Sequence, residues 1–487
     1  MEPALKPRIS MAWTLADVLD ATGGRLAAGA VQPLVFDSIS TDSRRSQPGA
    51  LFVALTGPNH DGHRYAVDAL ARGARAVIVR AVPANVPAHV AIVVADPLNA
   101  LQQLASWTRR RIAPRVIGIT GSNGKTTTKE MVAAICDHAA FPSPRTAVLK
   151  TAGNENNLIG VPLTLLRLTG NEAVAVLEMG MNAPGEIARL VEIADPDVGV
   201  VTNVGPVHLE GVGGTIAGVA AAKGEMFAGI RHNATIAVNL DDEWVVKIAA
   251  RFPGRRIEFG RGGEVEARAI VDFGLDGIGF DLHVAGRSTK VRLHIPGLHT
   301  VTNALAAAAV AHAIAVDLEA IRAGLAAVAP PPKRIQVVRL ANGTTLLNDS
   351  YNANPASIEA ALRVLERQTG RRIAVIGEML ELGTQSQELH RHVGRLAAKY
   401  HVGLLAAVGA RADALAEGAR EAGLASEAIR VCPDPATAAN WVASQWRAGD
   451  TILVKGSRGP ADEELVRLRG SRMAEVVRLL EEAGGRS

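Results

Sequence analysis

The residues whose types and spacing most clearly predict chemistry lie in the segment ITGSNGKTTT, residues 119–128. An apolar run precedes this segment and a helix-like stretch follows it. Its glycines adopt backbone angles that other residues resist, so the loop N–H groups can converge on phosphate oxygens at the positive end of a helix dipole. In such a loop Lys125 meets the terminal phosphates, and the Thr126 hydroxyl binds magnesium. The predicted phosphate-binding residues are Gly121, Ser122, Asn123, Gly124, Lys125, Thr126 and Thr127.

The spacing of this loop differs from that of the common P-loop. Ile119 stands where a glycine is usual, five residues before the Gly-Lys pair. A Gly-Lys-Thr triplet alone could also be a glycine-rich structural turn. The apolar strand before the loop and the helix after it favour phosphate binding.

Glu178 and His208 follow apolar strand-like runs, at the positions where open α/β sheets bind ligands. Phosphoryl transfer requires metal ions and cations that neutralise the transferred group. We therefore predict that Glu178 is a magnesium ligand, although a carboxylate there could also face solvent at the sheet rim. For His208 the two interpretations are a ligand and a structural residue, and a lone histidine is usually structural. Lys223 lies in a helix close to Glu225, and a surface lysine that forms helix ion pairs is its simplest interpretation.

Two polar clusters could bind a substrate or cap helices. Asn154, Asn156 and Asn157 stand in a loop before an apolar segment, and their amides suit either role. Asp349 begins the cluster DSYNANP after an apolar strand, and its carboxylate could bind a ribose hydroxyl or cap the next helix. Asn354 directly precedes a proline and is therefore the better candidate for that cap.

The order of strand-like and helix-like runs predicts an α/β protein of three domains. Residues 1–111 suffice for a small α/β domain, in which the Ser-, Asp- and Gly-rich segment 40–63 is either turns or a ligand surface. Residues 112–330 predict a parallel-sheet ATPase domain with antiparallel hairpins at 264–294. After a proline run, residues 331–487 predict a second parallel, Rossmann-like α/β domain.

Composition is that of an ordinary globular protein: 48% of the 487 residues are hydrophobic, 21% are charged, and the net charge is +4. The short basic run 109–111 is better explained as a solvated helix end than as a nucleic-acid patch, so we expect no nucleic-acid partner. Two cysteines cannot form a disulfide framework, and no run resembles a signal peptide or a membrane span. We expect a cytoplasmic protein.

Taken together, ten stretches in this order resemble the Mur ligase family, the ATP-dependent amide ligases that build the peptide of the bacterial cell wall. The stretches are DSRRSQPGALFVALTGPNHDGH, ITGSNGKTTTKEM, NENNLIGVPLTLL, LEMGMNAPGEI, VTNVGPVHLE, AAKGEMF, HTVTNALAAAAVA, NDSYNANPASIEAAL, GEMLELG and VKGSRG. The family also uses the short glycine-loop spacing seen here.

The resemblance implies roles at the phosphate end of a site shared by three domains. Lys125 and Thr126 would bind ATP phosphates and magnesium, and Glu178 would be a magnesium ligand. His208 would help to hold a second magnesium ion. Lys223 would be carbamylated by carbon dioxide, which turns a cation into an anion beside that second ion. The chemistry is reasonable, because an uncharged amine adds carbon dioxide and two divalent ions stabilise the product.

Other implied roles bring in residues distant along the chain. Asn303, Arg334 and Asp349 match positions that contact adenine, phosphate and ribose. Arg334 lies just past the proline run, so it could reach the phosphates only when the last domain closes on the central one. The implied substrate-binding residues are Ser43 and Arg44 in a uridine-nucleotide site, with Asn154, Asn157, Tyr351 and Asn352 elsewhere.

The stretches DSYNANP, NENNLIG and GEMLELG favour the member that adds D-alanyl-D-alanine to a UDP-N-acetylmuramoyl-tripeptide. We expect the protein to be a monomer. Whether the third residue of that peptide is lysine or diaminopimelate stays open. The alternatives are a sister ligase for another amino acid, a folate or cyanophycin ligase, or a nucleotide-dependent switch. One stretch departs from the family: residues 460–470 separate VKGSR from the last helix, and we expect them to add a helical turn or two.

Overall fold

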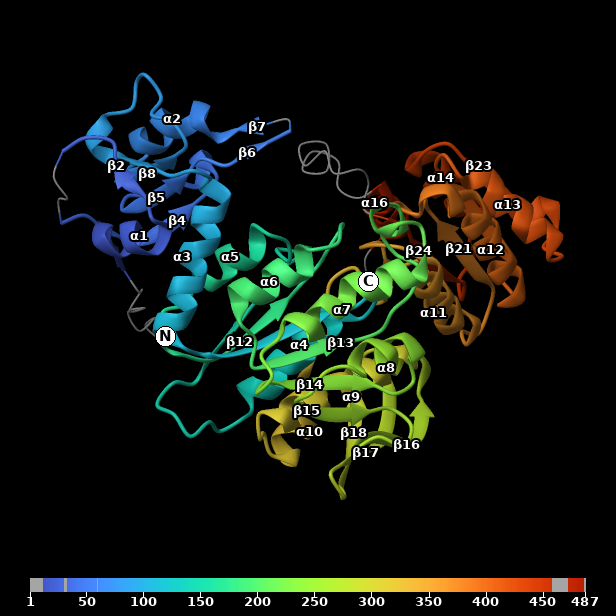
Figure 1. Cartoon of the computed structure of the whole chain (residues 1–487). Coiled ribbons are helices and arrows are strands. Elements are labelled where there is room, and N and C mark those ends of the chain that lie inside the picture. Colours follow the sequence, from blue (N-terminus) through green and yellow to red (C-terminus); the bar gives the residue numbers. More distant parts are fainter. Residues whose placement is uncertain (1–11, 30–32, 59, 458–471, 486–487) are drawn as a thin grey trace, which may run out of the picture.

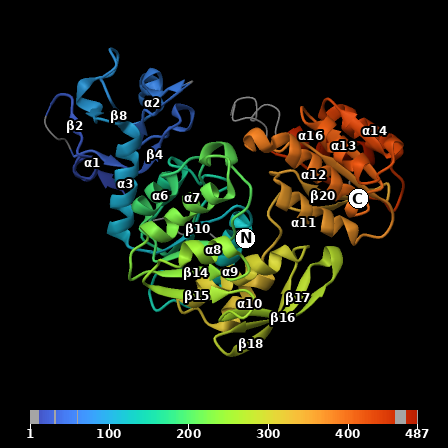
Figure 2. The same ribbon diagram turned by 45° about the vertical axis from the view of Figure 1, so that its right-hand side comes forward.

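The computed structural model describes residues 12–29, 33–58, 60–457 and 472–485. Three large sheets follow one another along the chain, each covered by helices, and the first and last lie at two ends of the middle one (Figures 1 and 2). We refer to each sheet with its helices as the N-terminal, central and C-terminal region. This is the expected three-part α/β architecture. Each predicted domain range holds one large sheet, and the boundaries themselves stay a prediction.

The N-terminal sheet has five strands in the order β2-β9-β8-β5-β4, and only the β2–β9 pair is antiparallel. Strands such as β8, AVIV, are buried throughout, as expected for parallel strands covered on both faces. The elements are β1 (Trp13–Thr14), α1 (Leu15–Thr22), β2 (Arg25–Leu26), β3 (Val35–Phe36), β4 (Ser38–Ser40), η1 (Ser43–Arg45), β5 (Ala50–Val53), β6 (Thr56–Gly57), β7 (His60–Asp61), α2 (Ala66–Ala71), β8 (Ala76–Val79), β9 (Ala91–Val93) and α3 (Pro97–Ile112).

The long helix α3 leads from the N-terminal sheet to the central one. Arg109 in its last turn is only 8% exposed, so the prediction of a solvated basic helix end is wrong for this residue. Its guanidinium donates to the carbonyl oxygens of Ala194 at 3.0 Å and Asp195 at 2.7 Å. Arg109 therefore anchors α3 to the central region, while Arg110 and Arg111 are exposed as expected.

The central sheet has nine strands in the order β11-β12-β10-β13-β14-β15-β16-β17-β18. Pairing is parallel from β11 to β16 and antiparallel from β16 to β18, which confirms the predicted hairpins. The strands are β10 (Arg115–Thr120), β11 (Ala147–Lys150), β12 (Glu172–Glu178), β13 (Val198–Val201), β14 (Thr235–Asn239), β15 (Arg255–Phe259), β16 (Val265–Asp272), β17 (Ile278–Val284) and β18 (Arg287–Leu293).

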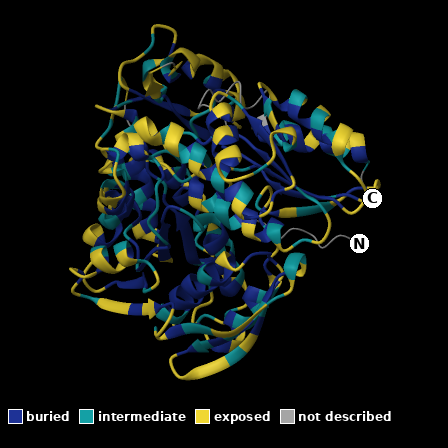
Figure 3. Ribbon diagram, turned by 90° about the vertical axis from the view of Figure 1, so that its right-hand side faces the viewer, coloured by how far each residue is buried: buried dark blue, intermediate teal, exposed yellow. Residues whose placement is uncertain are grey.

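Two hydrophobic cores cover the two faces of this sheet. Successive residues of β10 alternate between them: Val116 belongs to the core shared with the N-terminal region, and Ile117 to the core beneath α4, α9 and α10. Figure 3 shows buried residues gathered on the sheets and exposed residues on the outer helix faces. The helices are α4 (Lys125–Asp137), α5 (Gly160–Leu165), α6 (Glu186–Ala194), α7 (Ile216–Gly229), α8 (Glu243–Ala249), α9 (His299–Ala313) and α10 (Leu318–Ala327).

The C-terminal sheet has six strands in the order β19-β20-β24-β21-β22-β23. All neighbours are parallel except β19 and β20, so the expected all-parallel sheet carries one antiparallel edge strand. The elements are β19 (Gln336–Arg339), β20 (Thr345–Asp349), α11 (Pro355–Glu366), β21 (Arg372–Ile376), η6 (Gly383–Gln385), α12 (Ser386–Lys399), β22 (Leu404–Val408), α13 (Ala412–Glu421), β23 (Ile429–Cys432), α14 (Pro435–Gln445), β24 (Thr451–Lys455) and α16 (Arg472–Gly484).

The predicted extra helical turns at residues 460–470 lie outside the described residues. Among the residues that are described, no helix combines the length and the apolar character that a membrane crossing requires.

Candidate active site

A cleft of about 1190 Å³ lies where the central and C-terminal regions face each other. We define the glycine loop as residues 121–124, and residues 122–124 of it line the cleft together with the segments that follow β12 and β13. The C-terminal region contributes Asp349, residues 351–354, residues 356–357 and residues 380–382. Parallel strands of both sheets therefore point their carboxyl ends at one cleft, the usual ligand position of open α/β sheets.

The glycine loop passes very close to its neighbours. Gly121 has a φ of 143°, and Gly124 has a φ of 81° at the start of α4. A Cβ atom at Gly121 would lie 1.9 Å from Thr202 Oγ1, and one at Gly124 would lie 2.1 Å from Asn303 Oδ1. Both positions therefore require glycine for the conformation and for the space.

The end of β13 holds the loop from the other side. Ser122 donates its N–H to the Asn203 carbonyl at 2.9 Å and its hydroxyl to the Gly205 carbonyl at 3.1 Å. Asn123 donates its N–H to Asn203 Oδ1 at 2.9 Å. The carbonyl of Asn123 accepts from Thr202 Oγ1 at 2.6 Å. The loop is thus shaped before any phosphate arrives, which lowers the entropy cost of binding one.

Lys125 bends back over the loop, and its Nζ donates to the Gly121 carbonyl at 2.7 Å. Burial lowers the pKa of Lys125; Glu178 opposes that shift and Arg334 adds to it. Thr127, the last predicted loop residue, is 8% exposed in the same helical turn. The Lys125 ammonium is bonded to a neutral carbonyl oxygen, and a bound phosphate would supply the negative charge that balances it.

Glu178, at the end of β12, is 2% exposed. Its Oε2 accepts from Thr126 Oγ1 at 2.8 Å, and its Oε1 accepts from Asn156 Nδ2 at 2.9 Å. A carboxylate beside a hydroxyl fits Mg²⁺, which usually takes one or two protein ligands and completes its shell with phosphates and water. The described residues contain no group of three or more His, Cys, Asp and Glu side chains suited to a metal. The protein alone therefore offers an incomplete cation site.

His208 lies in the loop after β13 and lines the cleft, with a φ of 53°. Its Nδ1 forms a short hydrogen bond with a carboxylate oxygen of Glu381, which belongs to the C-terminal region. The contact lowers the pKa of the Glu381 carboxyl. A carboxylate on one ring nitrogen is the usual support of a metal-binding histidine, since it orients the other nitrogen toward the metal. His208 is therefore suited to be a ligand through Nε2.

Lys223 lies in α7 and is 1% exposed, so the interpretation as a surface lysine is wrong. Glu225, its expected partner, instead accepts the N–H groups of Gly185 and Ala188 at 2.7 and 3.0 Å. Burial and the neighbouring Lys125 lower the pKa of Lys223 well below its ordinary value. The side chain lies behind the residues that line the cleft rather than among them. Its environment favours an uncharged amine.

Arg334 extends from the C-terminal region to the first turn of α4, next to the glycine loop. Its Nη2 donates to Thr126 Oγ1 at 2.9 Å, and its guanidinium lies 4.3 Å from the centre of the Tyr351 ring. This contact joins the C-terminal region to the central one beside the glycine loop. Asn303, 5% exposed in α9, lines the same part of the cleft.

Asp349 ends β20 beside a cation that the sequence reasoning did not name. Lys455, at the end of β24, donates to Asp349 Oδ2 at 2.6 Å and to the Asn352 carbonyl at 3.0 Å. The side chains of Lys455 and Asp349 are 3% and 10% exposed. Asp349 Oδ1 accepts no recorded hydrogen bond from the part of the chain that the structure describes, and Asp349 lines the cleft.

We expect Lys455→Met to lower the free energy of unfolding by about 3 kcal/mol, because it leaves the Asp349 carboxylate buried without its cation. Guanidinium denaturation of the whole protein would measure this change in the free energy of unfolding. Lys247→Met is the control, since Lys247 and its partner Glu243 are 58% and 73% exposed and such pairs contribute little. Equal stability of the two variants would contradict the expectation.

The two substrate-loop asparagines differ in what they contact. Asn157 Oδ1 accepts the N–H groups of Ile159 and Gly160 at 3.1 and 2.8 Å, so its side-chain oxygen is engaged by the turn that leads into α5. Asn154 lines the cleft. Asn156 is the amide that bonds to Glu178.

Ser43 and Arg44 lie apart from the other predicted site residues. They belong to η1 in the N-terminal region and do not line the cleft. Ser43 is buried, and Arg44 is ion-paired with Asp42 at 2.9 Å.

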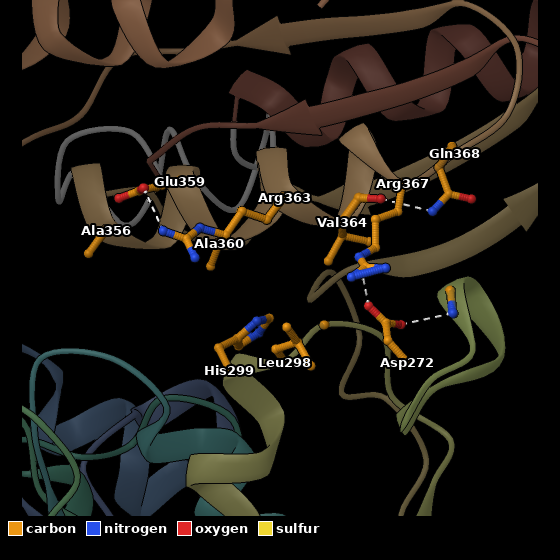
Figure 4. Close-up of a pocket in the computed structure, with 12 residues that line it drawn as sticks. Asp272, Leu298, His299, Ala356, Glu359, Ala360, Arg363, Val364, Arg367 and Gln368 are labelled. Atoms are coloured by element: carbon orange, nitrogen blue, oxygen red, sulfur yellow. Dashed lines mark hydrogen bonds and ion pairs between the residues drawn. The ribbon is translucent and has the colours of Figure 1, made fainter. Parts of the chain in front are cut away.

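A second cavity of about 360 Å³ adjoins the cleft between the central hairpins and α11, as Figure 4 shows. Both cavities are lined by His299 and Ala356. At its far end Arg367 Nε lies 3.0 Å from Asp272 Oδ2, an ion pair between the C-terminal and central regions. This pair docks the two regions without touching the glycine loop.

Comparison with known protein families identifies three successive matches along the chain. Residues 35–109 match the Mur ligase family catalytic domain, residues 119–311 the Mur ligase middle domain, and residues 333–458 the Mur ligase glutamate ligase domain. The UDP-N-acetylmuramoyl-tripeptide--D-alanyl-D-alanine ligase of Escherichia coli (strain K12) is 39% identical over 461 residues, which cover 93% of this chain and 97% of that protein. The chain belongs to the Mur ligase family.

Solved structures agree with this Mur ligase assignment. MurF from Acinetobacter baumannii superposes with a TM-score of 0.85 at 33% identity, over 96% of this chain and 99% of that chain. MurF ligase from Thermotoga maritima in complex with ADP gives a TM-score of 0.78 at 28% identity, over 92% and 97% of the two chains.

Sequence reasoning missed several residues of this Mur ligase cleft. Asn203 supports the glycine loop, Glu381 holds His208, and Lys455 holds Asp349. These three residues act on partners far along the chain. Asn354 was expected only as a helix cap, yet it also contacts Asn123. Asn156 was expected to bind a substrate or cap a helix, and its amide contacts Glu178.

Proposed function

We propose that this Mur ligase uses ATP to join D-alanyl-D-alanine to a UDP-N-acetylmuramoyl-tripeptide during peptidoglycan precursor synthesis in the cytoplasm. The observation that carries the proposal is the convergence of the glycine loop, Glu178 and Arg334 in one cleft between two regions. The activity is that of the similar ligase from Escherichia coli. The protein would act as a monomer.

ATP would bind along the cleft from the glycine loop to the C-terminal region. The N–H groups of the loop and Lys125 would hold the phosphates, together with Arg334. Asn303 would contact adenine. Asp349 would contact ribose through the oxygen that Lys455 leaves free.

Magnesium ions would be held at two places that fit them. The Thr126 hydroxyl and Glu178 form a hard-oxygen pair for one ion, and the Nε2 atom of His208 suits the second. Bound ions would neutralise charge on the transferring phosphoryl group.

Lys223 would carry a carbamate in the active protein. Burial lowers the pKa of its amine, which favours the uncharged form that adds carbon dioxide, and the anion formed would offset the charge of Lys125. The N–C bond forms as the amine loses a proton to the solvent.

The reaction would proceed in two steps. The terminal carboxylate of the tripeptide attacks the γ-phosphorus of ATP; the new O–P bond gives an acyl phosphate, and the β–γ bridge breaks to release ADP. The free amine of D-alanyl-D-alanine then attacks the acyl carbon, loses a proton, and expels phosphate. Lys125 and Arg334 would stabilise the charge that develops on the transferred group.

The substrates would extend away from the phosphates in two directions. Ser43 and Arg44 would contact the uridine nucleotide in the N-terminal region. Asn154 and Asn157 would line the path of the acceptor peptide, while Tyr351 and Asn352 would contact substrate from the C-terminal side. This arrangement uses all three regions.

Phosphate release in a matrix of UDP-muramoyl peptides and amines tests the function. Release that requires both UDP-N-acetylmuramoyl-tripeptide and D-alanyl-D-alanine supports the proposal. Release with a different amino acid would identify a sister ligase, and release with neither substrate would indicate a nucleotide-dependent switch. Tripeptides ending in lysine and in diaminopimelate belong in the same matrix.

A further inference from the structure

Two side chains of the C-terminal region reach the glycine loop and the first turn of α4. One is Arg334, which donates to Thr126 in α4. The other is Asn354, whose Nδ2 donates to Asn123 Oδ1 at 2.7 Å across 231 positions of sequence. Asn123 is part of the glycine loop, so the second contact acts directly on the segment that would hold phosphates.

Both polar atoms of the Asn354 side chain form hydrogen bonds. Oδ1 accepts the backbone N–H of Ser357 at 2.9 Å, while Nδ2 is the donor to Asn123. The backbone N–H of Asn354 donates to Ser357 Oγ at 3.0 Å, which completes a capping box at the start of α11. The residue is 7% exposed. Because the cap fixes the oxygen side of the amide, the nitrogen side is held toward the loop.

Asn123 has its main chain fully engaged by the central region. Its N–H donates to Asn203 Oδ1, and its carbonyl accepts from Asn203 Nδ2 at 3.0 Å and from Thr202 Oγ1. Its side-chain oxygen accepts from Asn354 and, among the described residues, from nothing else that the structure records. Gly124, the next residue, has the unusual φ of 81° that begins α4.

We propose that Asn354 is a positioning residue for the glycine loop. The central region already holds the main chain of the loop, and by holding the Asn123 side chain Asn354 adds a further restraint that exists only while the C-terminal region is docked. Phosphate binding is thereby coupled to docking of the region that supplies Arg334. The inference rests on the proposed function for its effect on ATP, but the restraint on the loop is present without any ligand.

The test uses Asn354→Ser, which keeps an N-cap oxygen and removes the donor to Asn123. We expect the KM for ATP to rise about fivefold, the size of one neutral hydrogen bond, with an unchanged melting temperature and KM for D-alanyl-D-alanine. We also expect faster amide hydrogen exchange in the peptide 119–128 of the ligand-free protein.

Two controls separate positioning from capping and from docking. Asp434→Ser alters the matched cap of α14, where Asp434 also precedes a proline and accepts the Thr437 N–H at 2.8 Å. Arg367→Gln breaks the ion pair with Asp272 between the same two regions, away from the loop. Asp434→Ser should change neither exchange in residues 119–128 nor the KM for ATP. The Arg367 side chain is 56% exposed, so Arg367→Gln should weaken docking only slightly and change both quantities less than Asn354→Ser does. An effect of Asp434→Ser equal to that of Asn354→Ser, or a larger effect of Arg367→Gln, would overturn the proposal.

A double-mutant cycle supplies the sharpest comparison. In an Asn123→Ala background the further change Asn354→Ser should raise the KM for ATP less than twofold, since the bond is already lost. Additive effects, or unchanged exchange in Asn354→Ser, would refute the positioning role. If the wild-type protein failed to use ATP while Asn354→Ser still accelerated exchange in the loop, the proposed function would be wrong and the restraint on the loop would stand.

Discussion

Lys125→Ala is expected to lower turnover by at least ~10²-fold, the usual loss when a preorganised charge-stabilising group is removed from a reaction site. Lys125 is held over the glycine loop by the Gly121 carbonyl, 2.7 Å from its Nζ. Its ammonium is positioned before substrates bind, so the charge of the transferring phosphoryl group would be met without reorganisation. Steady-state phosphate release with both substrates at saturation measures the effect.

The size of this loss distinguishes catalysis from binding. If Lys125 only bound ATP, high ATP concentrations would restore turnover, and the change would appear in KM. We expect kcat itself to fall. Lys247→Ala, on the surface of α8, is the control for loss of one positive charge and should keep normal turnover. Near-normal kcat in Lys125→Ala would contradict the assignment of the glycine loop as the phosphate site.

Local sequence patterns were sufficient for the parts of the site that local structure determines. The strand, glycine loop and helix around Lys125 follow one another directly, and Glu178 and His208 lie at strand ends that a parallel sheet brings to one edge. The antiparallel hairpins were predicted because runs such as FDLHVAG and VRLHIPG alternate apolar and polar residues, and β17 shows the matching alternation of buried and intermediate residues. Each of these features depends on neighbours within one or two elements.

Contacts between distant parts of the chain could not be predicted in the same way. Asn354 and Asn123 are 231 positions apart, and Lys455 and Asp349 are 106 positions apart. No periodicity or spacing rule links such pairs; they exist because two separate sheets face one cleft. Arg109 illustrates the same limit, because a basic helix end looks solvated until the segment packed against it is known.

Lys223 shows that the local sequence of a helix does not indicate whether a lysine is buried. Its helix, α7, has alanines before the lysine and a glutamate after it, the pattern of an ordinary exposed turn. In the fold this turn faces the central sheet, and the lysine is 1% exposed. A buried amine without a carboxylate partner is costly unless it loses its charge or gains an anion, and carbamylation would accomplish the second.

We expect Lys223→Ala to reduce turnover by at least ~10²-fold and short carboxylic acids, such as acetate or propionate, to restore part of it. Removing the side chain leaves a space that a small carboxylate can occupy, so the anion returns without the covalent bond. Turnover measured across a series of acid concentrations should rise to a plateau in the variant and stay flat in the wild-type protein.

Lys223→Met separates this account from simple packing. Methionine fills most of the lysine volume, so a purely structural role predicts substantial activity, whereas a role for the carbamate predicts little activity and little rescue because the space stays filled. Wild-type protein equilibrated with ¹³C-labelled bicarbonate should show one carbamate carbon signal that is missing in Lys223→Met. An active Lys223→Ala variant in acid-free buffer, or an identical ¹³C spectrum for the two proteins, would show the carbamate to be wrong, and the buried amine would then be neutral in the working protein.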